Sequence, residues 1–161
     1  MCGIVGCIHH PNAQAYRAKM LNMSRSIRHR GPDWSGCVVV GENDPKRQTR
    51  GSVLCHERLA IVGVDSGAQP LVSEDKKLYL AVNGEIYNFR QLRASLKDKV
   101  HFQTESDCEV IMYLYREHGP DFVNMLDGMF AFVLIDTSVH PHHVIAARDP
   151  IGITTLYYLS L

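Results

Sequence analysis

Cys2 is the residue of this chain best suited to chemistry, and it stands in the amino-terminal sequence MCGIVG. Removal of the initiator Met1 would leave Cys2 as the first residue, with a free α-amine beside its thiol. The amine has an ordinary pKa of about 8 and the thiol of about 8.5, so one residue would supply both nucleophile and proton acceptor. Gly3 and Gly6 suit a short strand that a ligand or another backbone approaches closely. The alternative is an ordinary buried thiol at the start of a strand.

The dipeptide Asn83-Gly84 is the candidate for stabilising negative charge on a reacting oxygen. A thiol that attacks an amide or ester carbonyl needs hydrogen-bond donors for the developing oxyanion. An Asn side-chain amide and a Gly backbone N–H can converge on one oxygen. The dipeptide follows an apolar stretch, so the alternative is a type I′ hairpin turn, for which Asn-Gly is a preferred sequence.

Two charged residues are candidates for binding a substrate that carries both charges. Arg58 could bind a carboxylate through two parallel hydrogen bonds, a planar geometry that Lys cannot match. An ordinary surface charge is the alternative for Arg58. Asp107 follows Ser106 at the start of a predicted helix and could receive an ammonium group, although the helix dipole alone favours an acidic residue there.

The elements that must position these residues are strands near both ends of the chain, with helices between them. The polar trio His56-Glu57-Arg58 interrupts two strand-like stretches, 53–55 and 59–62, and a functional site is one explanation. There is no regular alternation of strand and helix, so the pattern predicts an α+β layered fold with mainly antiparallel sheets. Strands are expected at 4–8, 37–40, 78–82, 129–136, 143–147 and 154–159, and helices at 15–28, around Phe89, Leu92 and Leu96, and at 106–118 behind an S-x-x-E capping box.

Composition favours one globular domain that acts on a small molecule. The 161 residues can bury a sizeable core without staples. Lys plus Arg and Asp plus Glu number 17 each, with no long basic run, so neither nucleic acid nor an anionic membrane is indicated as a partner. There is no signal peptide and no apolar run long enough to span a membrane, which predicts a cytoplasmic location.

The cysteines and histidines do not form the spacings of a metal centre. The five cysteines never form a C-x-x-C pair and are expected to be reduced thiols. His140, His142 and His143 lie beside Pro141 without a carboxylate or Cys at ligand spacing, which favours a polar turn. No phosphate-binding loop motif indicates a nucleotide site.

Eight ordered segments together resemble one family. The chain closely resembles the glutaminase domain of glutamine-hydrolysing asparagine synthetases, which are class II glutamine amidotransferases of the N-terminal-nucleophile hydrolase fold. The resemblance runs nearly end to end and depends on MCGIVG, RHRGPD, ERLAIV, GAQPL, NGEIYN, SDCE, LDGMFAF and ARDPIG.

The resemblance implies a four-layer αββα sandwich and a role for each matching residue. Cys2 would attack the side-chain amide of L-glutamine, ammonia would leave, and water would hydrolyse the thioester to glutamate. The implied oxyanion donors are Asn83 and Gly84, and the implied glutamine-binding residues are Arg58 for the carboxylate, Asp107 for the ammonium, and Glu85 with the backbone of Leu59, Ala60, Ile61 and Val62.

The resemblance also implies what residues 2–161 leave out. Family members continue into further strands and then a synthetase domain that adenylates aspartate, so the chain is expected to be a glutaminase domain truncated at its C-terminus. No cofactor is expected in this domain, because ATP and Mg would belong to the absent synthetase domain. A separate synthetase domain or a full-length homologue is a possible partner. The alternative is a catalytically silent fragment that only binds glutamine or associates with such a partner.

Overall fold

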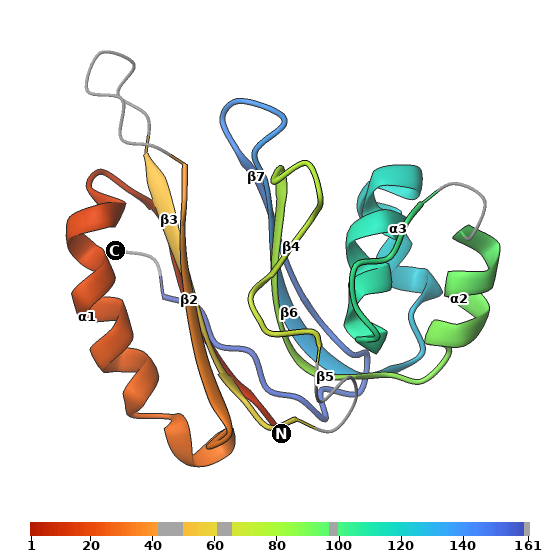
Figure 1. Cartoon of the computed structure of the whole chain (residues 1–161), viewed down its shortest axis with the longest axis horizontal. Coiled ribbons are helices and arrows are strands. Elements are labelled where there is room, and N and C mark those ends of the chain that lie inside the picture. The colour runs from red at the N-terminus through yellow and green to blue at the C-terminus, as the bar shows by residue number, and fades with distance from the viewer. Residues whose placement is uncertain (42–49, 61–65, 97–99, 160–161) are drawn as a thin grey trace.

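Two antiparallel sheets pack face to face, and helices cover both outer faces (Figure 1). The structure is a computed structural model that describes residues 1–41, 50–60, 66–96 and 100–159. The first sheet has the order β1-β3-β2 and lies under α1, and the second has the order β4-β5-β6-β7 and lies under α2 and α3. The predicted αββα sandwich of antiparallel sheets is confirmed. The bounds are β1 Gly3–His10, α1 Ala13–Arg25, β2 Trp34–Val40, β3 Gly51–Arg58, β4 Leu71–Val72, β5 Leu78–Ile86, α2 Phe89–Leu96, α3 Val110–His118, β6 Gly128–Asp136 and β7 His143–Arg148, with short 3₁₀ helices at Arg28–Arg30, Asp107–Glu109 and Gly119–Met125.

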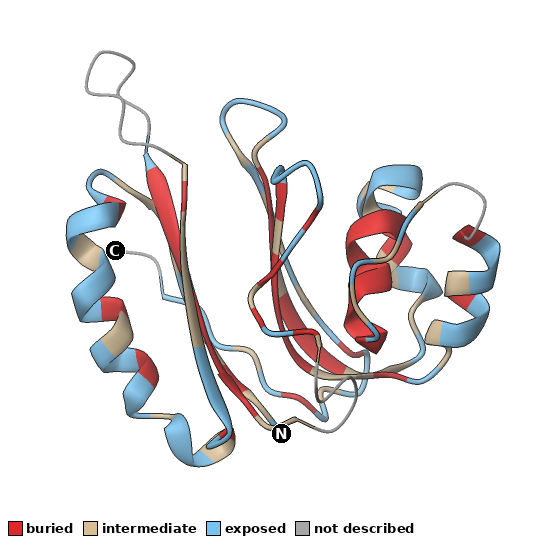
Figure 2. Ribbon diagram, viewed as in Figure 1, coloured by how far each residue is buried: buried red, intermediate tan, exposed pale blue. Residues whose placement is uncertain are grey.

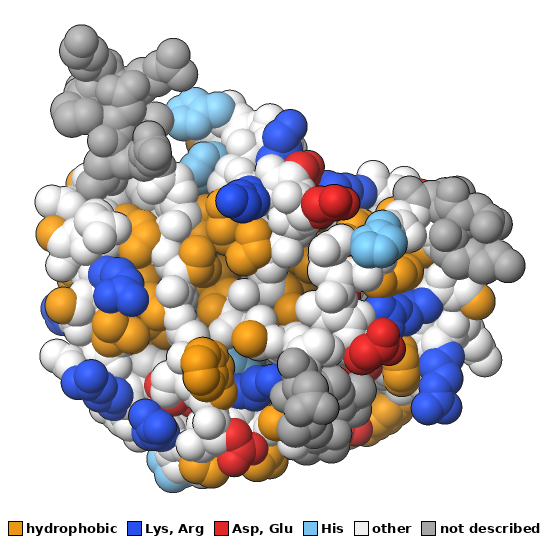
Figure 3. All heavy atoms as spheres, in the orientation of Figure 1, with side chains coloured by type: hydrophobic (Ala, Val, Ile, Leu, Met, Phe, Trp, Pro, Cys, Tyr) orange, Lys and Arg blue, Asp and Glu red, His pale blue; other side chains and the backbone are white. Residues whose placement is uncertain are grey.

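The period of two along each strand divides the interior into three apolar layers. On β3, Val53 and Cys55 pack against α1, whereas Leu54 packs between the sheets. On β5, Val82 packs against the helices of the second sheet, whereas Ala81 packs between the sheets. Buried residues accordingly follow one another along the central strands (Figure 2). In the space-filling view, hydrophobic side chains are visible between the two sheets, with charged side chains around them (Figure 3).

Side-chain caps fix where the helices begin. Asn12 Oδ1 accepts a hydrogen bond from the Ala15 N–H at 3.0 Å, which satisfies one of the open donors at the start of α1. Ser106 Oγ accepts from the Cys108 N–H at 3.3 Å and begins the helical segment that leads into α3. The predicted capping box is only half formed. The Glu109 carboxylate accepts hydrogen bonds from the N–H groups of residues 103 and 104 instead, at 2.7 and 2.8 Å.

Two predicted interruptions are in fact continuous strands. β3 runs through the His56-Glu57-Arg58 trio, and all three residues are buried. The strand tolerates them because their polar groups form hydrogen bonds with neighbouring elements. β5 runs straight through Asn83-Gly84, which pair with Ala131 and Phe130 of β6, so the hairpin-turn alternative is wrong. An Asn-Gly pair favours a turn only where the chain must reverse, and here the next residues keep the register with β6.

The predicted strand at 154–159 is wrong. These residues follow β7 without joining a sheet, and Tyr157, Tyr158 and Leu159 are 88, 95 and 82% exposed. None of the described strands pairs with these residues, and β propensity does not form a strand without such pairing. The helices in the described ranges include none that could cross a bilayer.

Asp149 organises the turn after β7. Its buried carboxylate accepts hydrogen bonds from the N–H groups of Phe130, Gly152, Ile153 and Thr154, at 3.3, 2.6, 2.9 and 3.0 Å. Burial raises the pKa of the Asp149 carboxyl, but these donors outweigh it and leave the pKa below its ordinary value. The charged carboxylate therefore stabilises the folded chain.

We expect Asp149→Asn to lower the free energy of unfolding at pH 7 by about 2 kcal/mol, because a charged acceptor of backbone N–H groups is lost. The folded-state pKa lies below the unfolded one, so this stabilisation is present above the ordinary Asp pKa and is lost as pH falls through the folded-state value. Urea unfolding at several pH values should show that the difference in free energy of unfolding between wild type and variant decreases below about pH 4. Glu74→Gln, at an exposed carboxylate, is the matched control. A gap that stayed constant from neutral to acid pH would contradict the assignment.

Candidate active site

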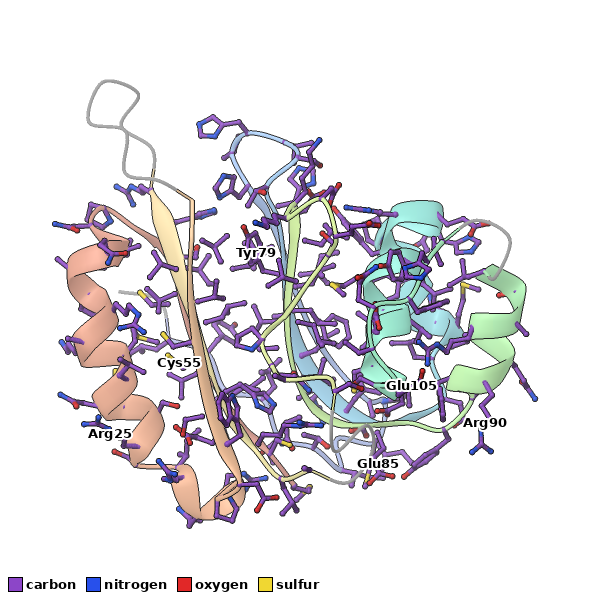
Figure 4. The ribbon with its side chains drawn as sticks, viewed as in Figure 1. Arg25, Cys55, Tyr79, Glu85, Arg90 and Glu105 are labelled. Atoms are coloured by element: carbon purple, nitrogen blue, oxygen red, sulfur yellow. The ribbon has the colours of Figure 1, made fainter. Side chains whose placement is uncertain are left out.

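A cavity opens at the end of the sandwich where β1 begins and where β3 and β5 end. Figure 4 labels Glu85 at this end of β5. Of the residues predicted from sequence, the cavity brings together Cys2, Arg58, Leu59, Gly84, Glu85 and Asp107. Strand alternation explains the convergence, because Arg58 shares the inner face of β3 with Leu54, and Glu85 shares the inner face of β5 with Ala81.

The remaining predicted residues either do not line the cavity or lie outside the described residues. Ala60 and Asn83 do not line the cavity, although both adjoin residues that do. Asn83 is buried, and its Oδ1 has no hydrogen-bond partner among the described residues. Ile61 and Val62 lie outside the described residues. Within the described ranges, no group of His, Cys, Asp and Glu is arranged to hold a metal ion.

The Cys2 thiol is held by the backbone of Leu59. The Leu59 N–H donates to Cys2 Sγ at 3.3 Å, and the thiol donates to the Leu59 carbonyl at 3.6 Å. Burial raises the pKa of the Cys2 thiol. The Leu59 hydrogen bond and the positive charges of the N-terminus and Arg58 partly offset this rise, and the Asp107 charge adds to it. A base beside the sulfur would therefore be needed to generate the thiolate near neutral pH.

The RHRGPD segment ties the start of β1 to the end of β3. Arg30 Nε donates to the Cys2 carbonyl at 3.1 Å. Asp33 Oδ2 accepts from the Ala60 N–H at 2.9 Å, and the Asp33 N–H donates to the Arg58 carbonyl at 3.0 Å. A Cβ on Gly31 would lie 2.2 Å from the Glu57 carbonyl oxygen, so glycine is required for this approach. The segment thus holds Cys2 and Arg58 in one frame.

The open edge of β5 presents a backbone donor to the cavity. Val82, Gly84 and Ile86 direct their backbone polar groups to the same edge, because alternate residues of a strand point the same way. The Val82 N–H donates to Gln69 Oε1 and the Ile86 N–H to Asp107 Oδ2, both at 2.7 Å. Gly84 lies between them and lines the cavity, so its N–H faces the space beside Cys2. At Gly84 φ is 148°, and a Cβ would lie 2.0 Å from the Met129 carbonyl oxygen.

Besides Met1, the cavity is lined by five further residues to which the sequence assigned no role in the site. They are Gly67, Gln69, Ser106, Cys108 and Met129. The segments GAQPL, SDCE and LDGMFAF contain all five, so their place in the resemblance was the available signal. A Cβ on Gly67 would lie 2.9 Å from Ser106 Cβ, which shows how closely GAQPL and SDCE approach.

Together these groups can support attack on a carboxamide. The cavity holds a thiol, a backbone N–H donor, a guanidinium and a carboxylate, and the opposite charges suit the two charged groups of an amino acid. An αββα sandwich with a cysteine thiol at the open end of its first strand defines the class of N-terminal-nucleophile hydrolases.

Comparison with known proteins identifies the family within this class. The model of the glutamine amidotransferase domain family matches residues 1–161, and the chain belongs to this family. A probable glutamine-hydrolysing asparagine synthetase of Schizosaccharomyces pombe is 59% identical over 159 residues, covering 98% of this chain and 26% of that protein. Glutamine-hydrolysing asparagine synthetase 3 of Arabidopsis thaliana is 54% identical over 160 residues, covering 98% of this chain and 25% of that protein. The chain thus spans about a quarter of the length of these relatives.

A solved structure supports the fold independently. Glutamine phosphoribosylpyrophosphate amidotransferase from B. subtilis, complexed with ADP and GMP, superposes with a TM-score of 0.60 at 24% identity. The match covers 94% of this chain and 37% of that one. At this identity the likeness concerns the fold, and it agrees with the two antiparallel sheets and their helical covers.

We expect Asp107→Asn to speed alkylation of Cys2 by iodoacetamide at a fixed pH near 8. The Asp107 charge raises the pKa of the Cys2 thiol, so its removal lowers that pKa and increases the thiolate fraction. Asn keeps an oxygen that can accept the Ile86 N–H. The rate would be measured by peptide mass spectrometry, with Glu105→Gln, an exposed neighbour, as the control. An equal or slower rate in Asp107→Asn would show that the carboxylate does not act on the sulfur.

Proposed function

We propose that the chain hydrolyses L-glutamine to glutamate and ammonia, with Cys2 as the nucleophile. The observation that supports this most directly is the single cavity in which the Cys2 thiol, the Gly84 N–H, Arg58 and Asp107 meet. Membership of the glutamine amidotransferase family supports glutamine as the substrate. In this proposal residues 2–161 act as a glutaminase domain.

The proposed reaction begins after removal of Met1 exposes the Cys2 α-amine. The amine accepts the thiol proton, and the sulfur attacks the side-chain amide carbon of glutamine. The Gly84 N–H, which faces the cavity, stabilises the oxyanion of the tetrahedral intermediate, and the resemblance implies the Asn83 side-chain amide as a second donor. The protonated amine then donates its proton to the leaving nitrogen, ammonia departs, and a thioester remains on Cys2. Water hydrolyses the thioester to glutamate and regenerates the thiol.

Binding of the substrate would depend on the two charged side chains. Arg58 is 8% exposed and Asp107 5%, so their interactions with a ligand are poorly screened by water. Arg58 would bind the glutamine carboxylate and Asp107 its ammonium. Glu85 and the backbone from Leu59 onward would complete the pocket, with Ala60, Ile61 and Val62 extending it as the resemblance implies.

The wider role that we propose is the supply of ammonia for asparagine synthesis. The asparagine synthetases that this chain resembles are about four times its length, so ATP-dependent chemistry would lie outside residues 2–161. We also propose a cytoplasmic location, which the five unpaired cysteines support, because such thiols persist in reducing compartments.

Purified chain should release glutamate from glutamine, and Cys2→Ala should lower that rate by about a thousandfold or more, because the proposed nucleophile is lost. Cys108 also lines the cavity, but burial raises the pKa of its thiol well above the ordinary value, so it does not replace Cys2. Intact mass should show loss of Met1. Cys37→Ala, which removes a partly exposed thiol from β2, is the matched control and should keep the wild-type rate. Folded protein that lacks Met1 and shows no Cys2-dependent release would defeat the enzymatic proposal. Glutamine binding by such protein would favour a silent binding module instead.

Arg58→Lys should raise KM for glutamine about tenfold or more while kcat falls less, because Lys keeps the charge but loses the planar pair of donors. Initial rates over a range of glutamine concentrations would separate the two constants. Arg90→Lys, at an exposed position on α2, is the control. An unchanged KM in Arg58→Lys would place the carboxylate site elsewhere.

A further inference from the structure

The backbone polar groups of Val82 lack a strand partner on the edge of β5 that faces the cavity. β4 pairs only with Leu80 and Tyr79, so the edge is uncovered from Val82 onward. Buried backbone groups without partners are costly, and two side chains supply the missing bonds. Gln69 Oε1 accepts from the Val82 N–H at 2.7 Å, and His56 Nε2 lies 2.8 Å from the Val82 carbonyl oxygen.

His56 bridges the two sheets as a neutral hydrogen-bond donor. Its side chain is fully buried on the inner face of β3 and does not line the cavity. Burial lowers the pKa of His56 to about 4, and the Arg58 charge acts in the same direction, while the Val82 hydrogen bond and Glu57 oppose the shift. The ring is therefore neutral at physiological pH. Because a carbonyl only accepts, Nε2 carries the proton and donates to Val82.

Gly36 explains how Gln69 reaches the same residue. Gly36 pairs directly with His56 in the first sheet. A Cβ on Gly36 would lie 1.8 Å from the Gln69 carbonyl oxygen, so the Gln69 backbone rests against β2 where a side chain would otherwise be. Gln69, whose backbone rests on β2, and His56 of β3 thus reach the two polar groups of Val82 from adjacent places.

We propose that His56 and Gln69 are positioning residues that fix the two peptides flanking Val82, His56 through the Val82 carbonyl and Gln69 through the Val82 N–H, and through them the direction of the Gly84 N–H. This inference rests on the proposed function. Gly84 has no side chain to hold it, and its N–H faces the edge of β5 that β4 leaves uncovered. Its direction therefore depends on the neighbouring strand residues that are held, Val82 through His56 and Gln69 and Ile86 through Asp107.

A positioning role predicts a specific kinetic effect. The oxyanion is present only in the transition state and intermediate, so poorer alignment of its donor lowers kcat and leaves KM nearly unchanged. A role in packing alone would instead lower the free energy of unfolding without this selective loss of kcat. His56→Leu keeps the bulk and removes the donor, whereas His56→Gln keeps an N–H donor of similar reach.

The first test measures kcat and KM for glutamine in these variants. We expect His56→Leu to lower kcat by about 10- to 100-fold with KM within about threefold, and His56→Gln to recover most of kcat. Leu54→Ala, on the same face of β3, should lose stability with kcat within about threefold, which controls for packing damage. Wild-type kcat in His56→Leu, or an equal loss in Leu54→Ala, would overturn the proposal.

The second test does not need activity. Amide hydrogen exchange followed by NMR should show faster exchange of the Val82 N–H in His56→Leu than in wild type, with amides of α1 unchanged. Gln69→Met, which removes the acceptor, should show the same effect. Unchanged exchange at Val82 in both variants would overturn the positioning role. If wild type proves inactive, the proposed function fails, and the exchange data still decide whether His56 and Gln69 hold the β5 edge.

Discussion

The packing of two sheets through one shared apolar layer is the constraint on which the site depends. Val40 and Leu54 of the first sheet meet Ala81 and Ile135 of the second. Once these residues face one another, strand alternation sends every second residue of β3 and β5 into the same space. At the open end of the sandwich those positions are no longer apolar. They carry Arg58 and Glu85, so the core and the cavity are successive parts of one layer.

The opposite face of β3 shows why a charged trio can occupy a buried strand. Glu57 points toward α1 and is 1% exposed. Its carboxylate accepts hydrogen bonds from Ser24 of α1 at 2.6 Å and from Ser35 of β2. A buried carboxylate is tolerated where its oxygens find donors, and these two hydroxyls come from elements that pack on β3. The strand that carries Arg58 is therefore stabilised by hydrogen bonds on the face opposite the cavity.

Backbone groups, rather than side chains, hold the reacting centre. The Cys2 thiol is bonded to the backbone of Leu59, and the donor proposed for the oxyanion is a glycine N–H. Their placement depends on strand continuity and on contacts such as the hydrogen bond from the Ala60 N–H to Asp33. Side-chain identity matters most where it determines backbone position, as it does at Gly31 and Gly84.

The sequence by itself determined the antiparallel α+β layering and the existence of most elements, because apolar period and helix capping are local properties. It also indicated which residues could carry chemistry. The predicted breaks at Asn83-Gly84 and at the His56-Glu57-Arg58 trio were wrong, because long-range pairing decides whether the strand continues there. Whether Asn-Gly turns or continues depends on β6, more than 40 residues away, and whether buried charge is tolerated depends on α1 and β2. Only the tertiary structure could show that His56 and Gln69 bond the open edge of β5, because those hydrogen bonds join residues that no local pattern relates.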